Sequence, residues 1–110
     1  MTLSQMKCVP GGQASALSKD SLATHLAMLP DWQQVGNELK KTFSFKNYYE
    51  TMAFVNATAW VSHREDHHPD LSVHYNKCIV SYSTHDAGAQ GGITLNDFIC
   101  AAKLDALFSL

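Results

Sequence analysis

The chain has 110 residues, of which 45% are apolar and 16% are charged, and its formal net charge is −2 at pH 7. This length predicts one domain with a single core and little room for an enclosed cavity. The balance of charge gives no concentrated basic surface for a nucleic acid, and no apolar run approaches the roughly 20 residues of a membrane-spanning helix. The composition therefore favours a small globular protein that binds neither nucleic acid directly nor membrane.

The three cysteines, Cys8, Cys78 and Cys100, are an odd number and include no C-x-x-C pair. This pattern argues against a disulfide framework and favours a reducing compartment. The first residues lack the basic and apolar segments of a signal peptide. We therefore expect a cytoplasmic protein.

The predicted elements begin after residues 1–16, whose mixture of glycine, glutamine, serine and proline has no periodicity and indicates a flexible tail. A single domain is expected over residues 17–110. Leucines spaced i, i+4 and i+7 predict a first helix in the segment 17–29, with Ser18 as its N-cap. Pro30 is expected to end this helix.

Two further segments are predicted from the middle of the chain. Gly36-Asn37 lies between two extended runs and predicts a hairpin over residues 32–45. Residues 46–66 have the longest helical pattern, with an apolar arc wide enough to contact more than one neighbour. Pro69 is expected to set the end of this helix, because the residue before a proline is excluded from helical geometry.

The last third predicts another hairpin and a closing helix. Apolar and polar residues alternate over residues 71–84, and a glycine-rich loop follows at 85–92. Residues 94–108 have helical periodicity, and Thr94 and Asp97 have the spacing of a capping box. The order of helix, hairpin, helix, hairpin and helix predicts an α+β two-layer sandwich, in which helices pack on one face of a four-stranded antiparallel sheet.

Four of the six histidines lie within "HREDHHPDLSVHY", residues 63–75, and this crowding allows more than one interpretation. His63 and His67 are spaced i, i+4, as in metal-binding helices. A zinc site would need further ligands from His74, His85 or Asp86. No H-E-x-x-H pattern exists and the cysteines are badly placed for it, so we predict no metal site.

An acid–base site fits the histidines better. Imidazoles can both donate and accept protons near pH 7 without a metal. The adjacent pair His67-His68 at a helix end would project in different directions into one pocket, and His85 could reach it from the end of the second hairpin. His63 and His74 can each be explained as ordinary solvent-facing residues.

The stretch "HREDHHPDLSVHYNKCIVSYSTHDAG", followed by "TLNDF", resembles the core of the pterin-4a-carbinolamine dehydratase family. The resemblance runs from about Leu17 to Leu107 and includes "LPDWQ" and "KTFSFKNYYETMAFVNATA". The order of His-His-Pro, a hairpin aromatic residue, Ser-Thr-His and a later Asp is quite specific. The family fold, a four-stranded antiparallel sheet with helices on one side, agrees with the predicted layout.

The resemblance implies a dehydratase that removes water from a 4a-hydroxytetrahydropterin and yields the quinonoid dihydropterin, which recycles the cofactor of aromatic amino acid hydroxylases. It implies no metal and no bound cofactor. The family's three catalytic histidines match His67, His68 and His85, with His67 and His85 near the reacting C4a–OH and N5 and His68 holding the pterin. The residues expected to line the substrate site are His63, Asp66, Pro69, Ser83, Thr84, Asp86 and Asp97.

The chain departs from the family pattern at two places. His63 stands where many members have a glutamate, so it is expected to tune the neighbouring histidines. The loop before Asp97 is longer than in many members, which leaves the rim of the pocket undefined.

The resemblance also implies a homodimer or homotetramer, with Phe54, Trp60 and Val61 as candidate contacts. The alternative function is a non-catalytic dimerisation or assembly cofactor of another protein.

Overall fold

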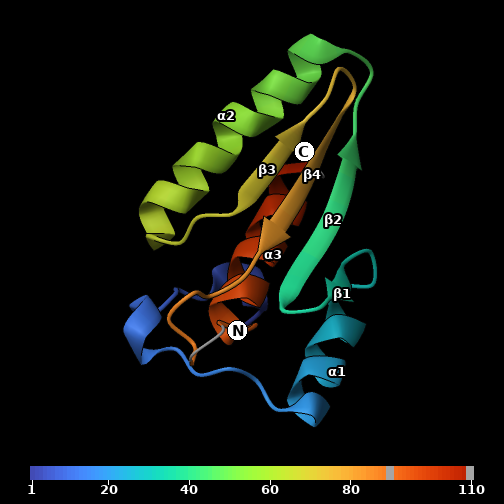
Figure 1. Cartoon of the computed structure of the whole chain (residues 1–110). Coiled ribbons are helices and arrows are strands. Elements are labelled where there is room, and N and C mark those ends of the chain that lie inside the picture. Colours follow the sequence, from blue (N-terminus) through green and yellow to red (C-terminus); the bar gives the residue numbers. More distant parts are fainter. Residues whose placement is uncertain (89–90, 109–110) are drawn as a thin grey trace.

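The computed structural model describes residues 1–88 and 91–108, which form a four-stranded antiparallel sheet with three α-helices (Figure 1). The helices are α1 (Lys19–Met28), α2 (Tyr48–Glu65) and α3 (Leu95–Phe108), and two 3-10 turns precede them, η1 (Leu3–Gln5) and η2 (Gly11–Gln13). The strands are β1 (Gln33–Val35), β2 (Glu38–Ser44), β3 (Asp70–Val73) and β4 (Lys77–Tyr82), in the spatial order β1-β2-β4-β3. The predicted α+β fold is confirmed.

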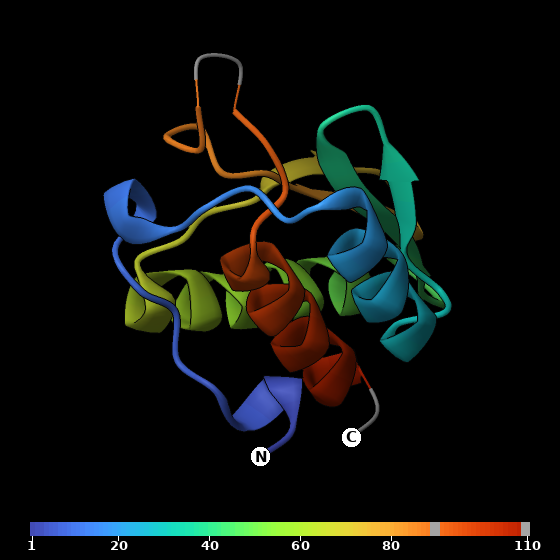
Figure 2. The ribbon, with the colours of Figure 1, turned by 90° about the horizontal axis from the view of Figure 1, so that it is seen from below.

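The core lies between the sheet and the helices, which Figure 2 shows on the same side of the sheet. Period-2 alternation turns one set of strand residues toward the helices. This set is almost completely buried and consists of Leu39, Phe43, Cys78, Val80 and Tyr82. Within the described ranges, none of the helices is long and apolar enough to cross a membrane.

Helix α2 begins at Tyr48, two residues after the predicted start, and its end differs from the prediction in its cause. The Asn47 side chain caps it by accepting a hydrogen bond from the backbone N–H of Glu50 at 2.9 Å. At its other end Asp66 has the left-handed conformation (φ 50°), and the backbone N–H groups of Asp66 and His67 both bond to the carbonyl of Ser62. The His67 bond is the 6→1 bond of a Schellman motif and the Asp66 bond is the 5→1 bond of an αL cap, and together they close the helix at Asp66.

Two expectations about this region are therefore wrong. Pro69 does not end the helix, because the left-handed turn at Asp66 has already done so. His67 lies outside the helix, so His63 and His67 do not share a helical face. Of the candidate oligomer contacts on α2, Phe54 and Val61 are buried in the protein's own core, whereas Trp60 is 63% exposed.

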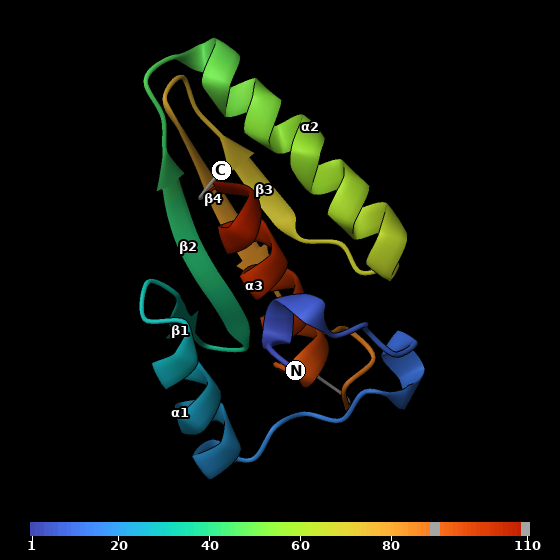
Figure 3. The same ribbon diagram turned by 180° about the vertical axis from the view of Figure 1, so that it is seen from behind.

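The N-terminal residues also differ from the expected tail. Residues 4–17, which we call the N-terminal strap, run across α3 between the end of α2 and the start of α1 (Figure 3). The Lys103 side chain donates to the backbone carbonyl of Ser4 at 2.8 Å, and Cys8 and Leu17 pack against the core. A few isolated anchors hold this segment, and such anchors leave no periodic signal in the sequence.

Candidate active site

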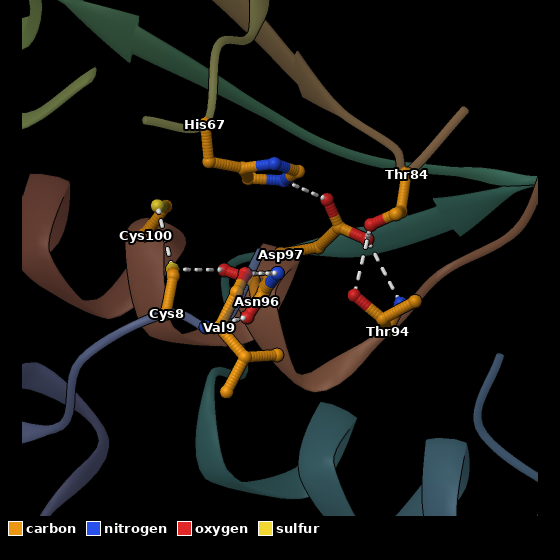
Figure 4. A network of polar contacts seen from close by, with 8 residues as sticks. All are labelled: Cys8, Val9, His67, Thr84, Thr94, Asn96, Asp97 and Cys100. Carbon is orange, nitrogen blue, oxygen red and sulfur yellow. Dashed lines mark hydrogen bonds and ion pairs between the residues drawn. The ribbon is translucent and has the colours of Figure 1, made fainter. Parts of the chain in front are cut away.

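Three segments that are distant in sequence meet at one end of the sheet, where α2 ends, β4 ends and α3 begins (Figure 4). His67 lies in the turn after α2, and Thr84 lies two residues after the end of β4. The first turn of α3 supplies Asp97, with Thr94 just before the helix. Buried hydrogen bonds connect all four side chains.

His67 is buried and pairs directly with Asp97. Its Nε2 lies 2.6 Å from Asp97 Oδ1. The imidazole ring also lies nearly parallel to the Tyr82 ring, with an interplanar angle of 9° and centroids 5.7 Å apart. A carboxylate oxygen only accepts hydrogen bonds, so the proton in this contact is carried by Nε2 of the imidazole.

Asp97 is fully buried, and both of its carboxylate oxygens have partners. Oδ2 accepts hydrogen bonds from the Thr84 hydroxyl at 2.9 Å and from the backbone N–H of Thr94 at 2.8 Å. The Thr94 hydroxyl lies 2.8 Å from that of Thr84, which leaves it to donate to the Thr84 oxygen. The predicted capping contact from Asp97 to Thr94 is thus present, but the same carboxylate also orients His67.

Behind His67 lies a second buried group of titratable side chains. Burial raises the pKa of Tyr82, and the nearby Cys100 and Cys8 thiols and the Asp97 carboxylate raise it further. The neighbouring Cys8 thiol, burial and the Glu65 and Asp97 carboxylates raise the pKa of Cys100. Tyr82 and Cys100 therefore stay protonated at neutral pH, and the uncharged Tyr82 ring lies against the imidazole.

The other histidines of the cluster do not join this network. His68 is exposed and, with His63 and Pro69, lines a shallow hollow of about 290 Å³ against α2. His74 is exposed near the β3–β4 turn, where its Nε2 lies 2.9 Å from the Ser72 hydroxyl. The adjacent residues His67 and His68 therefore face different surroundings, one internal and one external.

The segment after β4 places one of its expected site residues in the network and leaves the others outside it. Thr84 is buried, Ser83 is half-buried, and His85 and Asp86 are exposed, as is Asp66 at the end of α2. Within residues 1–88 and 91–108, no hydrogen bond or ring contact joins His85 to His67. Part of the predicted 85–92 loop, residues 89–90, lies outside the described residues.

This arrangement can hold and transfer a proton. Asp97 engages Nε2 of His67, and in the described part of the chain the other ring nitrogen, Nδ1, has no hydrogen-bond partner. Of the two ring nitrogens, Nδ1 is therefore the one left to contact a bound molecule. No group of three or more His, Cys, Asp or Glu side chains suited to a metal ion occurs among the described residues.

Two members of the site were missed as functional residues from the sequence. Thr94 was expected only as a helix cap, and Tyr82 only as a strand residue. An alternating strand pattern shows that Tyr82 points inward, but it does not show which ring lies above it.

Comparison with known proteins gives a consistent result. The sequence profile described as pterin 4 alpha carbinolamine dehydratase matches residues 15–107. A protein from Chromobacterium violaceum, provisionally named a pterin-4-alpha-carbinolamine dehydratase, is 57% identical over 108 residues, which cover 98% of this chain and 97% of the relative. A relative from Nitrosospira multiformis with the same provisional name is 53% identical and covers 98% of this chain and 94% of its own.

A crystal structure from Brucella melitensis, described as a transcriptional coactivator/pterin dehydratase, superposes with a TM-score of 0.78 at 27% identity, covering 84% of this chain and 98% of its own. The sequence relatives and this solved structure agree, and the profile match spans most of the chain. The chain therefore belongs to the pterin 4 alpha carbinolamine dehydratase family.

Proposed function

We propose that this protein dehydrates a pterin-4a-carbinolamine by general acid–base catalysis, with His67 as the central proton-transfer residue. The observation that carries the proposal is the 2.6 Å contact between His67 Nε2 and Asp97 Oδ1 in a buried setting. The family and the names of close relatives support the same reaction class.

The reaction breaks the C4a–O bond and forms a double bond between C4a and N5. The leaving hydroxyl takes up one proton and departs as water, and N5–H loses one proton, so the pterin becomes the quinonoid dihydropterin. Protons balance and no electrons are exchanged with another molecule. One group must therefore give a proton and one must take a proton, which imidazoles do near neutral pH.

We assign His67 Nδ1 to one of these proton transfers, and we expect His85 to take part in the other. His68 is expected to hold the pterin, and backbone and side chains of Asp66, Ser83 and Asp86 to line its site. His63, Pro69, Thr84 and Asp97 complete the expected set. His68 and His85 are both exposed and so accessible to a bound molecule, although His68 faces different surroundings from His67.

The cellular role follows from the same chemistry. Removing water from the carbinolamine would return the pterin to the tetrahydrobiopterin cycle of a pterin-dependent hydroxylase. We expect a cytoplasmic homodimer or homotetramer that uses no metal or bound cofactor.

The test is the rate of 4a-carbinolamine dehydration, followed by ultraviolet absorbance against a protein-free baseline. We expect His67→Ala and His85→Ala each to lose well over tenfold in rate. His74→Ala is the matched control and should keep the full rate, because this exposed imidazole hydrogen-bonds to Ser72, away from the His67–Asp97 network. Unchanged rates in both catalytic variants would reject the proposal.

A second candidate function is that of an interaction protein. It is favoured by the description of the Brucella melitensis structure as a coactivator as well as a dehydratase, and by the exposure of Trp60 on α2. If wild type and His67→Ala both dehydrate at the baseline rate, the interaction function becomes the leading explanation.

A further inference from the structure

We propose that the N-terminal strap is a working part of the candidate active site, and that Glu65 and Asn96 are positioning residues which act through it on His67 and Asp97. The expected effect of the strap on the reaction rate rests on the proposed dehydratase function, whereas its expected effect on the His67–Asp97 geometry does not.

The strap is fastened first to the end of α2. Glu65 is buried, and its carboxylate accepts the backbone N–H of Cys8 at 2.8 Å. Lys7 Nζ donates to the carbonyl of Arg64 at 3.3 Å, one of the carbonyls at the helix C-terminus that have no intrahelical partner. Glu65 precedes His67 by only two residues, so this attachment fixes the turn that carries the imidazole.

The strap is fastened next to the start of α3. Asn96 is 2% exposed, and its side-chain amide pairs with both backbone groups of Val9 (Figure 4). Val9 N–H donates to Asn96 Oδ1 at 3.0 Å, and Asn96 Nδ2 donates to the Val9 carbonyl at 2.8 Å. Asn96 is the direct neighbour of Asp97, so this pair of bonds fixes the turn that carries the carboxylate.

The same segment also contacts the loop that carries His85. The backbone N–H of Leu17 donates to the carbonyl of Ile93 at 2.9 Å. A methyl group at Gly11 would lie 3.2 Å from Asp86 Oδ2, so the strap passes close to that side chain. The strap therefore touches all three segments that supply the candidate site residues.

These contacts bear on the chemistry because the His67–Asp97 contact is short and joins two separate elements. A shift of either turn by a few tenths of an ångström would lengthen it, and misplaced catalytic groups are costly. Glu65 and Asn96 are buried polar groups that bond the strap backbone, so removing either leaves a strap N–H without its acceptor. The strap thus fixes the position of the turn that carries His67 relative to the turn that carries Asp97.

The experiment compares Asn96→Ala and Glu65→Ala with wild type in the full-length chain. Glu65→Gln is the conservative variant, because its amide oxygen can still accept the Cys8 N–H. Val9→Pro removes one strap N–H at a half-exposed position and leaves every core side chain intact. Lys41→Met is the control, because it breaks a partly buried ion pair with Asp105 in the second half of α3.

Two readouts separate positioning from stability. One is kcat and KM for dehydration. The other is the NMR signal of the His67 Nε2 proton, which a short hydrogen bond to a carboxylate moves downfield and which needs no substrate. We expect the two alanine variants and Val9→Pro to lose about tenfold or more in kcat with little change in KM, and to lose or shift the downfield signal.

Glu65→Gln should retain the signal and most of the rate, and Lys41→Met should lower stability alone. The proposal is overturned if the alanine variants and Val9→Pro keep the wild-type signal and kcat while losing only stability, as the control does. If wild type itself has no dehydratase activity, the proposed function fails, and the NMR signal still decides whether the strap positions His67.

Discussion

Helix α3 carries two acidic side chains that meet very different partners. Near its end, Asp105 bonds to Lys41 Nζ at 2.7 Å and to Trp32 Nε1 at 3.1 Å. Near its start, Asp97 is fully buried and bonds to His67, Thr84 and the Thr94 backbone. One helix therefore presents the same functional group to two separate polar networks.

The difference lies in what the partner can do. The Asp105–Lys41 pair is a partly buried ion pair that stabilises the fold. An imidazole side chain can both give and accept a proton, which is what the proposed function requires of the Asp97–His67 pair. The chemistry of the partner, more than burial, is therefore what singles out Asp97 as the candidate site carboxylate.

The largest expected effect comes from exchanging each carboxylate for its amide. We expect Asp97→Asn to reduce the dehydration rate by about 100-fold or more, because the amide no longer stabilises the His67 cation. Asp105→Asn should leave the rate within about twofold, because it removes a structural ion pair. Steady-state kinetics on both variants measure the dehydration rate. Equal losses of rate would show that Asp97 is no more important for the reaction than Asp105.

The next largest effect is expected from removing one uncharged side chain that donates a hydrogen bond to each carboxylate. Thr84→Val keeps the shape of the side chain but removes the donor to Asp97 Oδ2, and we expect a rate loss of about tenfold. Trp32→Phe removes the indole donor to Asp105, and we expect no loss of rate but a loss of about 1–3 kcal/mol in the free energy of unfolding. Kinetics and urea denaturation, applied to both variants, separate the two outcomes.

A third prediction concerns alkaline pH. The Cys8 thiol and burial raise the pKa of Cys100, and burial raises the pKa of Tyr82, whereas in the unfolded chain a thiol titrates near pH 8.5 and a phenol near pH 10. The folded protein thus retains protons that the unfolded chain loses. The contribution of these two groups to the free energy of unfolding is therefore fully present below about pH 8.5 and decreases as the pH rises.

We expect the free energy of unfolding to fall by roughly 1–3 kcal/mol between pH 8 and pH 10. Cys100→Ala should flatten this slope by about 1.4 kcal/mol per pH unit. Urea denaturation at several pH values provides the slope, and an unchanged slope in Cys100→Ala would contradict the prediction.

The smallest effect is expected at Tyr82, beneath His67. Its hydroxyl is buried and has no nitrogen or oxygen partner among the described residues. Tyr82→Phe keeps the ring that lies parallel to His67 and removes a hydroxyl whose polar neighbour is the weakly bonding Cys100 thiol, so we expect unchanged or slightly greater stability, by up to about 1 kcal/mol. Thermal unfolding measures the change, and a clear destabilisation would show that the hydroxyl has a stabilising contact.

The elements of the fold could be predicted because each has a local cause. Alternating residues placed β2 and β4, and Ser18 and Asn47 cap their helices with short-range bonds. The site was only partly predictable, because its contacts join residues about 10 to 30 positions apart. The sequence and the resemblance gave the identities of His67 and Asp97, but not their direct contact.

Two features had no usable signal. The left-handed turn falls on Asp66, a residue type less common there than glycine, so the proline three positions later was the more obvious helix end. The strap attaches through backbone groups, and any residue has these. Its two receiving side chains, Glu65 and Asn96, look like ordinary polar helix residues until the strap lies beside them.

The turn at Asp66 also determines which of the two following histidine side chains points into the protein. The side chains of successive residues in an extended chain point to opposite sides. His67 is accordingly buried and His68 is exposed. The length of the link from Asp66 to Pro69 is therefore as constrained as its composition. Inserting one residue directly after Asp66 would exchange the inner and outer places, and each imidazole would then lie where the other lies now.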